Sequence, residues 1–291
     1  MPIVIGAISP HGIRTIPLLS DTADGAPGTR HALLELGRRF AAAEPEILFI
    51  CGPHGVRVNG FVSLSDTARG AGTAYWRDKQ VELNVRMDRE FAQLVAGKAR
   101  ERGVPVAQIG FGGTNPPTSV LQLDWSVIVP AWFAAYQVNM TGMGHPLADR
   151  PADIDAAGGP ALVVANPSRM LPREANIEFG RAVAEAANES GKRVGFIASC
   201  DWSHTHVDSH RFKQHPAAKD VDARVVQAIK DDNIASLIDL DEDAASNAAI
   251  DGLWQALMLE GVKQITPMPV DFLSYEVAEY FGMIVATYQP A

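Results

Sequence analysis

Short apolar runs alternate with amphipathic stretches along the whole chain, and this alternation is typical of strands that are crossed over by helices. We expect strands at these apolar runs: Met1–Ser9, Glu46–Cys51, Val104–Ile109, Pro160–Ala165, Arg193–Ser199 and Phe281–Gln289. We expect helices where apolar residues recur at helical spacing: Gly28–Ala43, Leu83–Arg102, Arg173–Ser190, Ala217–Lys230 and Asp243–Glu260. The pattern predicts an α/β fold with a central, mostly parallel sheet flanked by helices, in which the C-terminal strand can run antiparallel.

The chain shows no linker that would divide it into two domains. Its 291 residues are enough to bury a sizeable core. The stretch Gly142–Pro160 is rich in Gly, Pro and Asp, and it is expected to form a long surface loop. We therefore expect residues 1–291 to form a single domain.

Composition and charge narrow the class of partner. No apolar run reaches the roughly 18 residues of a membrane span, and the N-terminus lacks the basic start and cleavage site of a signal peptide. The two cysteines, Cys51 and Cys200, each close an apolar run, as buried thiols do in a reducing compartment. We therefore expect a cytoplasmic protein without a membrane partner. The net charge of −9 argues against a nucleic-acid partner and favours a small molecule.

Two of the expected strands end alike, in Ser-Pro-His11-Gly and Gly-Pro-His54-Gly. Ligands gather outside the carboxyl ends of parallel strands, so both imidazoles can face one crevice. Proline stiffens the turn before each histidine and glycine frees the turn after it. A third cluster follows the strand Arg193–Ser199, where His204 and His206 alternate with small polar residues. At most one of these two histidines is expected to face the same crevice.

Two or three imidazoles and one carboxylate suit either a zinc site or a 2-His-1-carboxylate iron(II) site with open positions for dioxygen and substrate. The candidate carboxylate is Asp251, which interrupts an apolar segment and shares a helical face with Asn247 and Trp254. A metal would offset the cost of burying this carboxylate, although an exposed acid or a charge near a helix N-terminus is the alternative. The sequence contains no phosphate-binding loop and no Gly-x-Ser-x-Gly nucleophile motif.

In this order and spacing, the motifs resemble those of the class III extradiol ring-cleavage dioxygenases of the protocatechuate 4,5-dioxygenase β-subunit type. A first strand ending in Ser-Pro-His, a second ending in Pro-His-Gly and a later strand leading into Ser-x-Asp-x-Ser-His occur here at His11, His54 and residues 199–204. The likeness spans nearly the whole chain. It implies an iron(II) ion held by His11, His54 and a carboxylate, with His204 as an acid/base near the substrate.

The chain departs from the family pattern at two places. The family carboxylate near the C-terminus is normally a glutamate, and Asp251, which is one methylene shorter, occupies the nearest matching place. Many relatives have Asp-His-Gly where this chain has Asp124, Trp125 and a serine. One proton-transfer group is therefore missing, and either His204 acts alone, or His145 or His206 replaces it, or the substrate needs less acid/base help.

The resulting hypothesis is an Fe(II)-dependent dioxygenase that opens a catechol-like or 2-aminophenol-like ring with O2. Its metal ligands would be His11, His54 and Asp251, and His204 would move the protons. The expected substrate-binding residues are Asp124, Trp125, His206 and Trp254.

Two alternatives stay open. One is a zinc-dependent hydrolase or lyase on the same fold, and the other is a non-catalytic relative that binds a ligand or partner through the cleft. Arg57, Arg169 and Arg173 either pair with a substrate carboxylate or are surface cations. The resemblance also implies a homodimer or a larger homo-oligomer.

Overall fold

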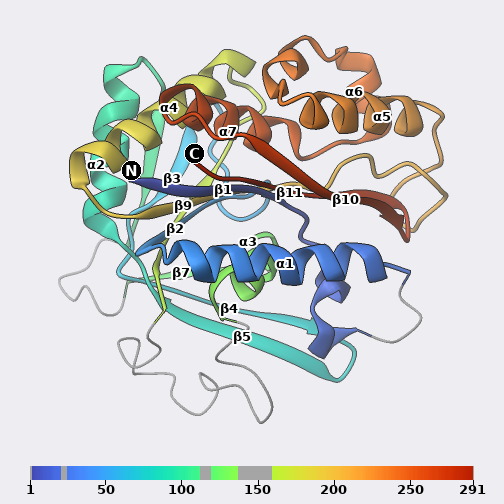
Figure 1. Cartoon of the computed structure of the whole chain (residues 1–291), viewed down its shortest axis with the longest axis horizontal. Helices are drawn as coiled ribbons and strands as arrows, with labels where there is room; N and C mark the ends of the chain where they lie inside the picture. Colours follow the sequence, from blue (N-terminus) through green and yellow to red (C-terminus); the bar gives the residue numbers. More distant parts are fainter. Residues whose placement is uncertain (1, 21–24, 112–118, 137–158, 291) are drawn as a thin grey trace.

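An eight-stranded sheet runs through the centre of the protein (Figure 1). The computed structural model describes residues 2–20, 25–111, 119–136 and 159–290. In spatial order the strands are β10 (Val270–Ala278), β11 (Phe281–Tyr288), β1 (Ile3–Ser9), β9 (Val194–Ser199), β2 (Ile47–Cys51), β8 (Ala161–Asn166), β3 (Val62–Ser65) and β6 (Val106–Ile109). Strands β1, β9, β2 and β8 are parallel, whereas β11 pairs antiparallel with both β1 and β10. The predicted single α/β domain with a mostly parallel sheet and antiparallel C-terminal strands is confirmed.

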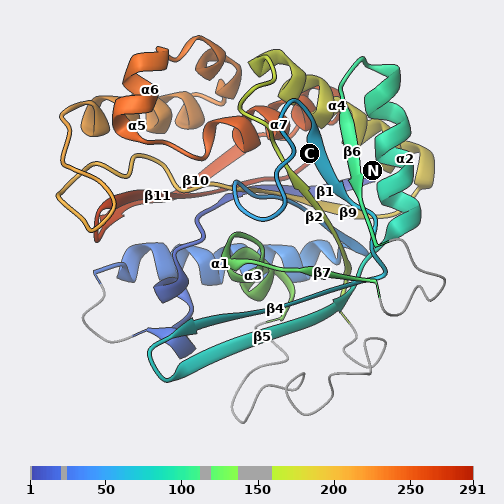
Figure 2. The same ribbon diagram turned by 180° about the vertical axis from the view of Figure 1, so that it is seen from behind.

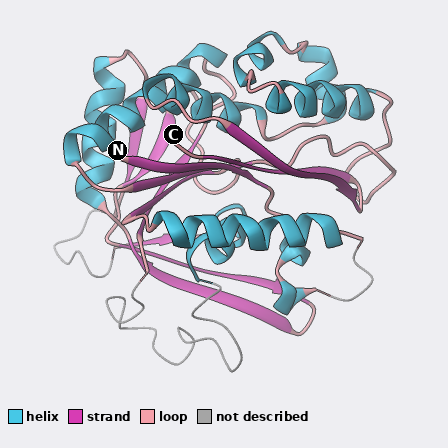
Figure 3. Cartoon of the chain, viewed as in Figure 1, coloured by secondary structure: helices cyan, strands magenta, loops and turns pink. Residues whose placement is uncertain are grey.

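Helices cover both faces of this sheet (Figure 3). On one face lie α2 (Arg89–Glu101), α4 (Arg173–Ser190), α5 (Ala217–Lys230), α6 (Glu242–Ala248) and α7 (Leu253–Ile265). On the other face lie α1 (Pro27–Ala43) and α3 (Trp125–Ala131), the latter continued by the π-helical turn Trp132–Tyr136. Phe49 of β2 packs in the core shared with α4, and its neighbours Leu48 and Ile50 pack in the core shared with α1. Because both faces are buried, β1, β9, β2 and β8 are apolar up to the polar residues Ser9, Ser199 and Asn166, at which three of them end.

A second, three-stranded sheet lies beyond α1 and α3 (Figure 2). It consists of β5 (Lys79–Arg86), β4 (Arg69–Trp76) and β7 (Val120–Gln122). The helix predicted over Leu83–Arg102 is therefore wrong in its first part, because residues 83–86 belong to β5. Leu83 and Val85 are buried at every second position, as in a strand. The helix begins only after Asp88, whose Oδ1 accepts a hydrogen bond from the Phe91 amide (2.9 Å).

The helix predicted over Asp243–Glu260 is also wrong, since two helices, α6 and α7, occupy this segment. Ala249 ends α6 in the left-handed conformation (φ 52°). The Ala248 carbonyl accepts a hydrogen bond from the His204 amide (2.8 Å), and the Ala249 carbonyl accepts one from His204 Nδ1 (2.9 Å). These carbonyls therefore bind a distant loop instead of continuing the helix. Asp251 lies in the link between the two helices and does not share a helical face as predicted.

The other predicted elements agree with the structure to within two residues at each end. Strands β3, β4, β5, β7 and β10 were not predicted. Residues 142–158 of the predicted surface loop, which include His145, lie outside the described residues. Within the described ranges, no helix is long and apolar enough to cross a membrane.

Helices α4 and α7 approach each other closely enough for backbone contact. A Cβ atom added at Gly180 would lie 1.8 Å from the Met258 carbonyl oxygen, and one added at Gly261 would lie 1.9 Å from the Ile177 carbonyl oxygen. Glycine at both positions therefore permits this packing. The contact anchors α7, whose N-terminal end follows directly after Asp251.

Candidate metal centre

Two parallel strands of the central sheet, separated by one strand, bring His11 and His54 together. His11 follows β1 and His54 follows β2, and both strands pair with β9, which lies between them. The two imidazole ring centroids are 5.3 Å apart, with the ring planes nearly perpendicular (86°). The His11 residue is 1% exposed, whereas His54 is half-buried. The sheet topology thus places two imidazoles at one crevice.

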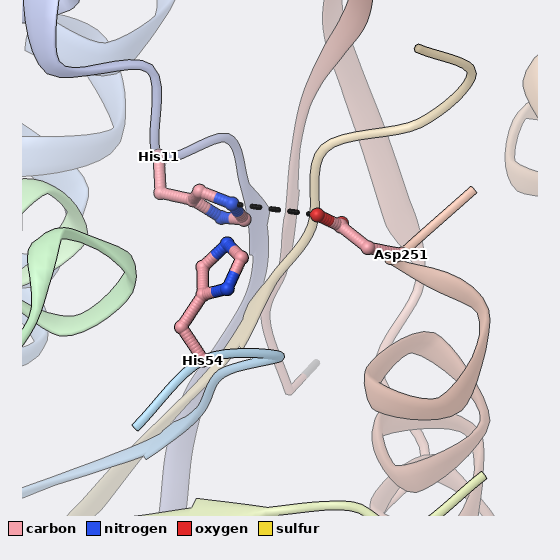
Figure 4. Close-up of side chains that lie close together, drawn as sticks. All are labelled: His11, His54 and Asp251. Carbon is pink, nitrogen blue, oxygen red and sulfur yellow. Dashed lines mark ion pairs between the residues drawn. The ribbon is translucent and has the colours of Figure 1, made fainter. Parts of the chain in front are cut away.

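Asp251 reaches the same place from the link between α6 and α7 (Figure 4). Its Oδ2 lies 3.7 Å from His11 Nε2, and the residue is 7% exposed. One ligand atom from each of His11, His54 and Asp251 lies within 4.8 Å of the other two. This group of two imidazole nitrogens and one carboxylate oxygen is compatible with one shared metal ion.

The orientation of His11 is fixed by a serine behind it. The Ser199 hydroxyl donates its single proton to the Ser126 carbonyl (2.6 Å). It can therefore only accept from His11 Nδ1, which lies 3.0 Å away and must carry the proton of the neutral ring. In this neutral form, which is the form that can bind a metal, the lone pair of Nε2 faces Asp251. A hydrogen bond from the second ring nitrogen is what usually orients a metal-binding histidine.

Asp201 is a site residue that the sequence analysis did not single out. Its Oδ2 lies 3.2 Å from His11 Nε2, and its Oδ1 accepts a hydrogen bond from the His11 amide (3.0 Å). The Asp201 amide in turn donates to Asp251 Oδ1 (3.1 Å). Burial raises the pKa of the Asp201 carboxyl. The sequence feature that could have identified Asp201 is its place as the aspartate of the Ser-x-Asp-x-Ser-His motif.

The electrostatics of the site favour a cation. Burial lowers the pKa of His11, but Asp201 and Asp251 more than offset this effect, and the pKa rises to about 9. Burial and the positive charge of His11 lower the pKa of His54 to about 4. Burial opposes ionisation of Asp251, yet its hydrogen bond to His11 and the charges of the nearby histidines lower its pKa overall. A metal ion could provide the positive charge that a proton on His11 otherwise supplies.

His204 presents one nitrogen to the site. Its Nδ1 bonds to the Ala249 carbonyl, which can only accept, so Nδ1 carries a proton. Its Nε2 lies 3.8 Å from Asp251 Oδ2. The ring stacks on Phe281, with centroids 5.6 Å apart, and a second aromatic ring, that of Phe212, lies at the same distance. Nε2 is therefore the atom of His204 that can exchange a proton with a ligand.

A cavity of about 1210 Å³ opens in front of these residues. Its wall includes His11, His54, Asp124, Trp125, Asp201, His204 and Asp251. The Trp125 ring lies 4.6 Å from the His54 ring, centroid to centroid.

Two predicted substrate-binding residues do not lie in this wall. His206 Nε2 hydrogen-bonds the fully buried Asp222 carboxylate (2.8 Å). Trp254 packs beneath the guanidinium of Arg169, with the Arg169 Cζ 4.4 Å from the ring centroid. Each of these side chains contacts a protein partner, and the structure does not bring His206 or Trp254 into the cavity wall with the other predicted site residues.

The three arginines considered from the sequence occupy different places. Arg57 is exposed and lies outside the cavity wall. Arg173 donates to the Ile238 carbonyl (2.8 Å) and ties α4 to the segment before α6. Arg169 does line the cavity.

Comparison with known proteins gave a family match, a curated relative and solved structures of similar fold. The family described as the catalytic LigB subunit of aromatic ring-opening dioxygenase matches residues 7–279. Protein CA_C1420 of Clostridium acetobutylicum is 21% identical over 242 residues, which cover 83% of this chain and 47% of that protein. The chain thus spans about half the length of this curated relative. The crystal structure of the uncharacterized protein JW3007 from Escherichia coli K12 has a similar fold, with a TM-score of 0.59, 14% identity, and coverage of 98% of this chain and 99% of that one.

Proposed function

Because the chain belongs to the LigB family of catalytic subunits of aromatic ring-opening dioxygenases, we propose that it is an iron(II)-dependent extradiol dioxygenase. Its substrate would be a catechol-like or 2-aminophenol-like ring. The observation that carries the proposal is the grouping of His11, His54 and Asp251 at the cavity wall. Two histidines and one carboxylate are the ligand set of many non-haem iron(II) oxygenases. Bound iron(II) would supply positions for the two adjacent heteroatoms of the substrate and for O2, and would pass electron density between them.

His204 is the proposed acid/base. Its Nδ1 is held by the Ala249 carbonyl, which leaves Nε2 to take a proton from a substrate hydroxyl or amine and to return it later. The stacked Phe281 ring supports the imidazole from the side, so it can keep its orientation while the proton moves. An imidazole suits both duties because its ordinary pKa lies near neutrality.

Trp125 is the proposed wall for the aromatic ring of the substrate. It stands beside His54, where the family pattern often has a histidine, and indole cannot take up a proton at neutral pH. Asp124 accepts hydrogen bonds from the Ser126 amide (2.7 Å) and hydroxyl (2.6 Å). Asp124 therefore caps α3 and holds the Trp125 segment in place.

The first test measures metal content and oxygen uptake together. Protein purified without oxygen is loaded with Fe(II), and iron per chain, O2 consumption and ring-fission absorbance are recorded with catechol and 2-aminophenol. We expect about one iron per chain and substrate-dependent O2 uptake, both lost in Asp251→Ala because a ligand is gone. The matched control is Asp243→Ala, which removes an exposed carboxylate on α6 and should change neither reading.

Three results would contradict the proposal. Tightly bound zinc without oxygen uptake would point to the hydrolase or lyase that the same ligands could support. Protein that holds no metal and has no affinity for added iron would point to a non-catalytic binding relative. Unchanged iron content in Asp251→Ala would remove Asp251 from the ligand set.

A further inference from the structure

Asp222 is a fully buried carboxylate that lies outside the cavity wall. It belongs to α5, the helix that packs on β10 and β11 (Figure 1). Burying a carboxyl group is costly unless its oxygens accept hydrogen bonds. The donors that surround Asp222 therefore indicate which part of the protein it holds.

Three groups donate hydrogen bonds to the Asp222 carboxylate. Its Oδ1 accepts from the Ser203 amide (3.0 Å), and its Oδ2 accepts from His206 Nε2 and from the Tyr275 hydroxyl (2.8 Å each). Burial and the nearby Asp222 charge raise the pKa of Tyr275, so its hydroxyl keeps the proton that it donates. Ser203 and His206 lie on the two sides of His204. Asp222 thus fixes the chain both before and after His204.

Strand β11 leaves room for this carboxylate at Gly282. A Cβ atom added there would lie 2.1 Å from Asp222 Oδ2. The Gly282 backbone also binds the same segment, because its carbonyl accepts from the Trp202 amide (2.9 Å) and its amide donates to the Ser203 carbonyl (3.0 Å). The segment that leads to His204 is therefore held between α5 and β11.

The direction of the His204 ring depends on where this segment runs. The His204 amide and Nδ1 bond to the carbonyls of Ala248 and Ala249, which end α6. Both bonds form only if the backbone of residues 203–206 passes the end of α6 at the right distance, and Asp222 holds that backbone from the other side. A shift of the segment would release Nδ1, and the ring proton could then move to Nε2. Nε2 is the atom that the proposed reaction needs as a free acceptor.

We propose that Asp222 is a positioning residue, which holds residues 203–206 so that His204 presents an unprotonated Nε2 to the cavity. His206 is then a donor to Asp222 and not a second acid/base. The acid/base duty of His204 rests on the proposed function, whereas its orientation by Asp222 rests on the contacts of the described residues.

Two substitutions remove this hold, and two matched variants serve as controls. Asp222→Asn keeps the volume but replaces one acceptor with a donor, and His206→Leu removes one of the bonded groups. His206→Gln should restore the bond, because its amide can donate to Asp222. Tyr275→Phe removes a hydrogen bond from the same oxygen and leaves the bonds to residues 203 and 206 in place. Thermal unfolding checks that each variant folds, and His206→Leu carries the test if Asp222→Asn does not fold.

The first readout is the nuclear magnetic resonance spectrum of the full chain labelled with 15N-histidine, in mildly alkaline buffer. The nitrogen shifts of His204, assigned by their loss in His204→Gln, report which ring nitrogen carries the proton. We expect the proton on Nδ1 in the wild type, in His206→Gln and in Tyr275→Phe. In His206→Leu and Asp222→Asn it should move partly or wholly to Nε2, because the bond that selects the tautomer is weakened.

The second readout is O2 uptake by the Fe(II)-loaded protein with catechol and 2-aminophenol. His206→Leu should lower kcat by about 10- to 100-fold, since a positioned acid/base contributes about 10²- to 10⁴-fold. KM should change by less than about threefold, because substrate binding does not use this contact. His206→Gln and Tyr275→Phe should keep kcat within about threefold of the wild type. Iron content should be equal in all variants.

The outcomes separate this inference from the proposed function. A His204 proton that stays on Nδ1 in His206→Leu would overturn the positioning role, and so would an equal effect of Tyr275→Phe, which would trace the change to stability alone. A kcat that His206→Gln fails to restore would also overturn it. A moved proton with unchanged kcat would support the positioning and count against His204 as the acid/base. A wild type without O2 uptake would count against the dioxygenase, while the tautomer of His204 would still decide for or against Asp222.

Discussion

Replacing Ser199 with alanine should weaken metal binding while leaving every proposed ligand in place. The Ser199 hydroxyl accepts a hydrogen bond from His11 Nδ1 (3.0 Å) and donates one to the Ser126 carbonyl (2.6 Å). Without this acceptor, Nδ1–H of the buried His11 ring has no partner in the strand behind it. The ring can then turn or carry its proton on Nε2, and both changes take the Nε2 lone pair away from Asp251.

The expected loss of metal affinity is about 10- to 100-fold, the usual effect of removing a hydrogen bond that orients a metal-binding histidine. This corresponds to about 1.4–2.8 kcal/mol of binding free energy. The Ser126 carbonyl also loses its buried donor, which should lower the free energy of unfolding by about 1–3 kcal/mol. That second effect is present in the metal-free protein, so the two contributions can be measured separately.

The assay titrates metal-free protein with Fe(II) in competition with a chelator of known affinity, and chemical denaturation gives the stability. Ser203→Ala is the matched control, because Ser203 follows β9 and is buried like Ser199, but its hydroxyl has no hydrogen-bond partner in the described part of the chain. If the Fe(II) affinity of Ser199→Ala lies within twofold of that of Ser203→Ala, Ser199 does not orient His11 and the reasoning is refuted.

Two further predictions concern the helices around the site. Gly261→Ala should destabilise the protein by about 1–3 kcal/mol or more, because its Cβ would meet the Ile177 carbonyl oxygen at 1.9 Å. Denaturant titration measures this loss. Gly97→Ala is the control, because a Cβ at Gly97 of α2 would meet no other atom, and this variant should be more stable than the wild type by about 0.5–1 kcal/mol. Arg102→Met should lower the free energy of unfolding by about 1 kcal/mol near pH 7, because it removes the hydrogen bond from Arg102 Nε to Glu185 Oε2 (2.9 Å). This hydrogen bond lowers the pKa of Glu185 below 4.5, so the stabilisation is present above that pH and is lost as the pH falls through the folded value. The free energies of unfolding of wild type and variant should therefore converge as the pH falls from 7 to 3. A difference that stays constant over this range would contradict the stabilising role of the Arg102–Glu185 hydrogen bond.

The parts of the site that follow from strand topology could be predicted from the sequence. His11 and His54 come directly after apolar runs, and parallel strands place their carboxyl ends at one edge of a sheet. Asp251 was chosen as a ligand candidate, but its local structure was mistaken. The helical spacing of its segment does not reveal that His204, far away in the chain, binds the carbonyls of Ala248 and Ala249 and so ends α6.

The second sheet was missed for a different reason. Val81, Leu83 and Val85 alternate with polar residues as in a strand, but the run continues into a helix without a glycine or proline between them. Asp88 was the available boundary signal, since aspartate is a favoured helix cap. Asp201 was present in a motif that had been noted, yet its importance depends on burial and on its contacts with His11, which spacing alone does not show.

The strand order also bears on how the chain folds as it is synthesised. Strand β1 lies between β9 and β11, and β2 lies between β8 and β9, so every neighbour of these two early strands is translated later. Strand β1 therefore leaves the ribosome as a bare apolar segment and finds its first partner only when residues 194–199 have emerged. Such distant pairings are slow to form and expose aggregation-prone surface in the meantime. A nascent chain of this protein should consequently be a substrate for chaperones that shield apolar segments until translation has finished.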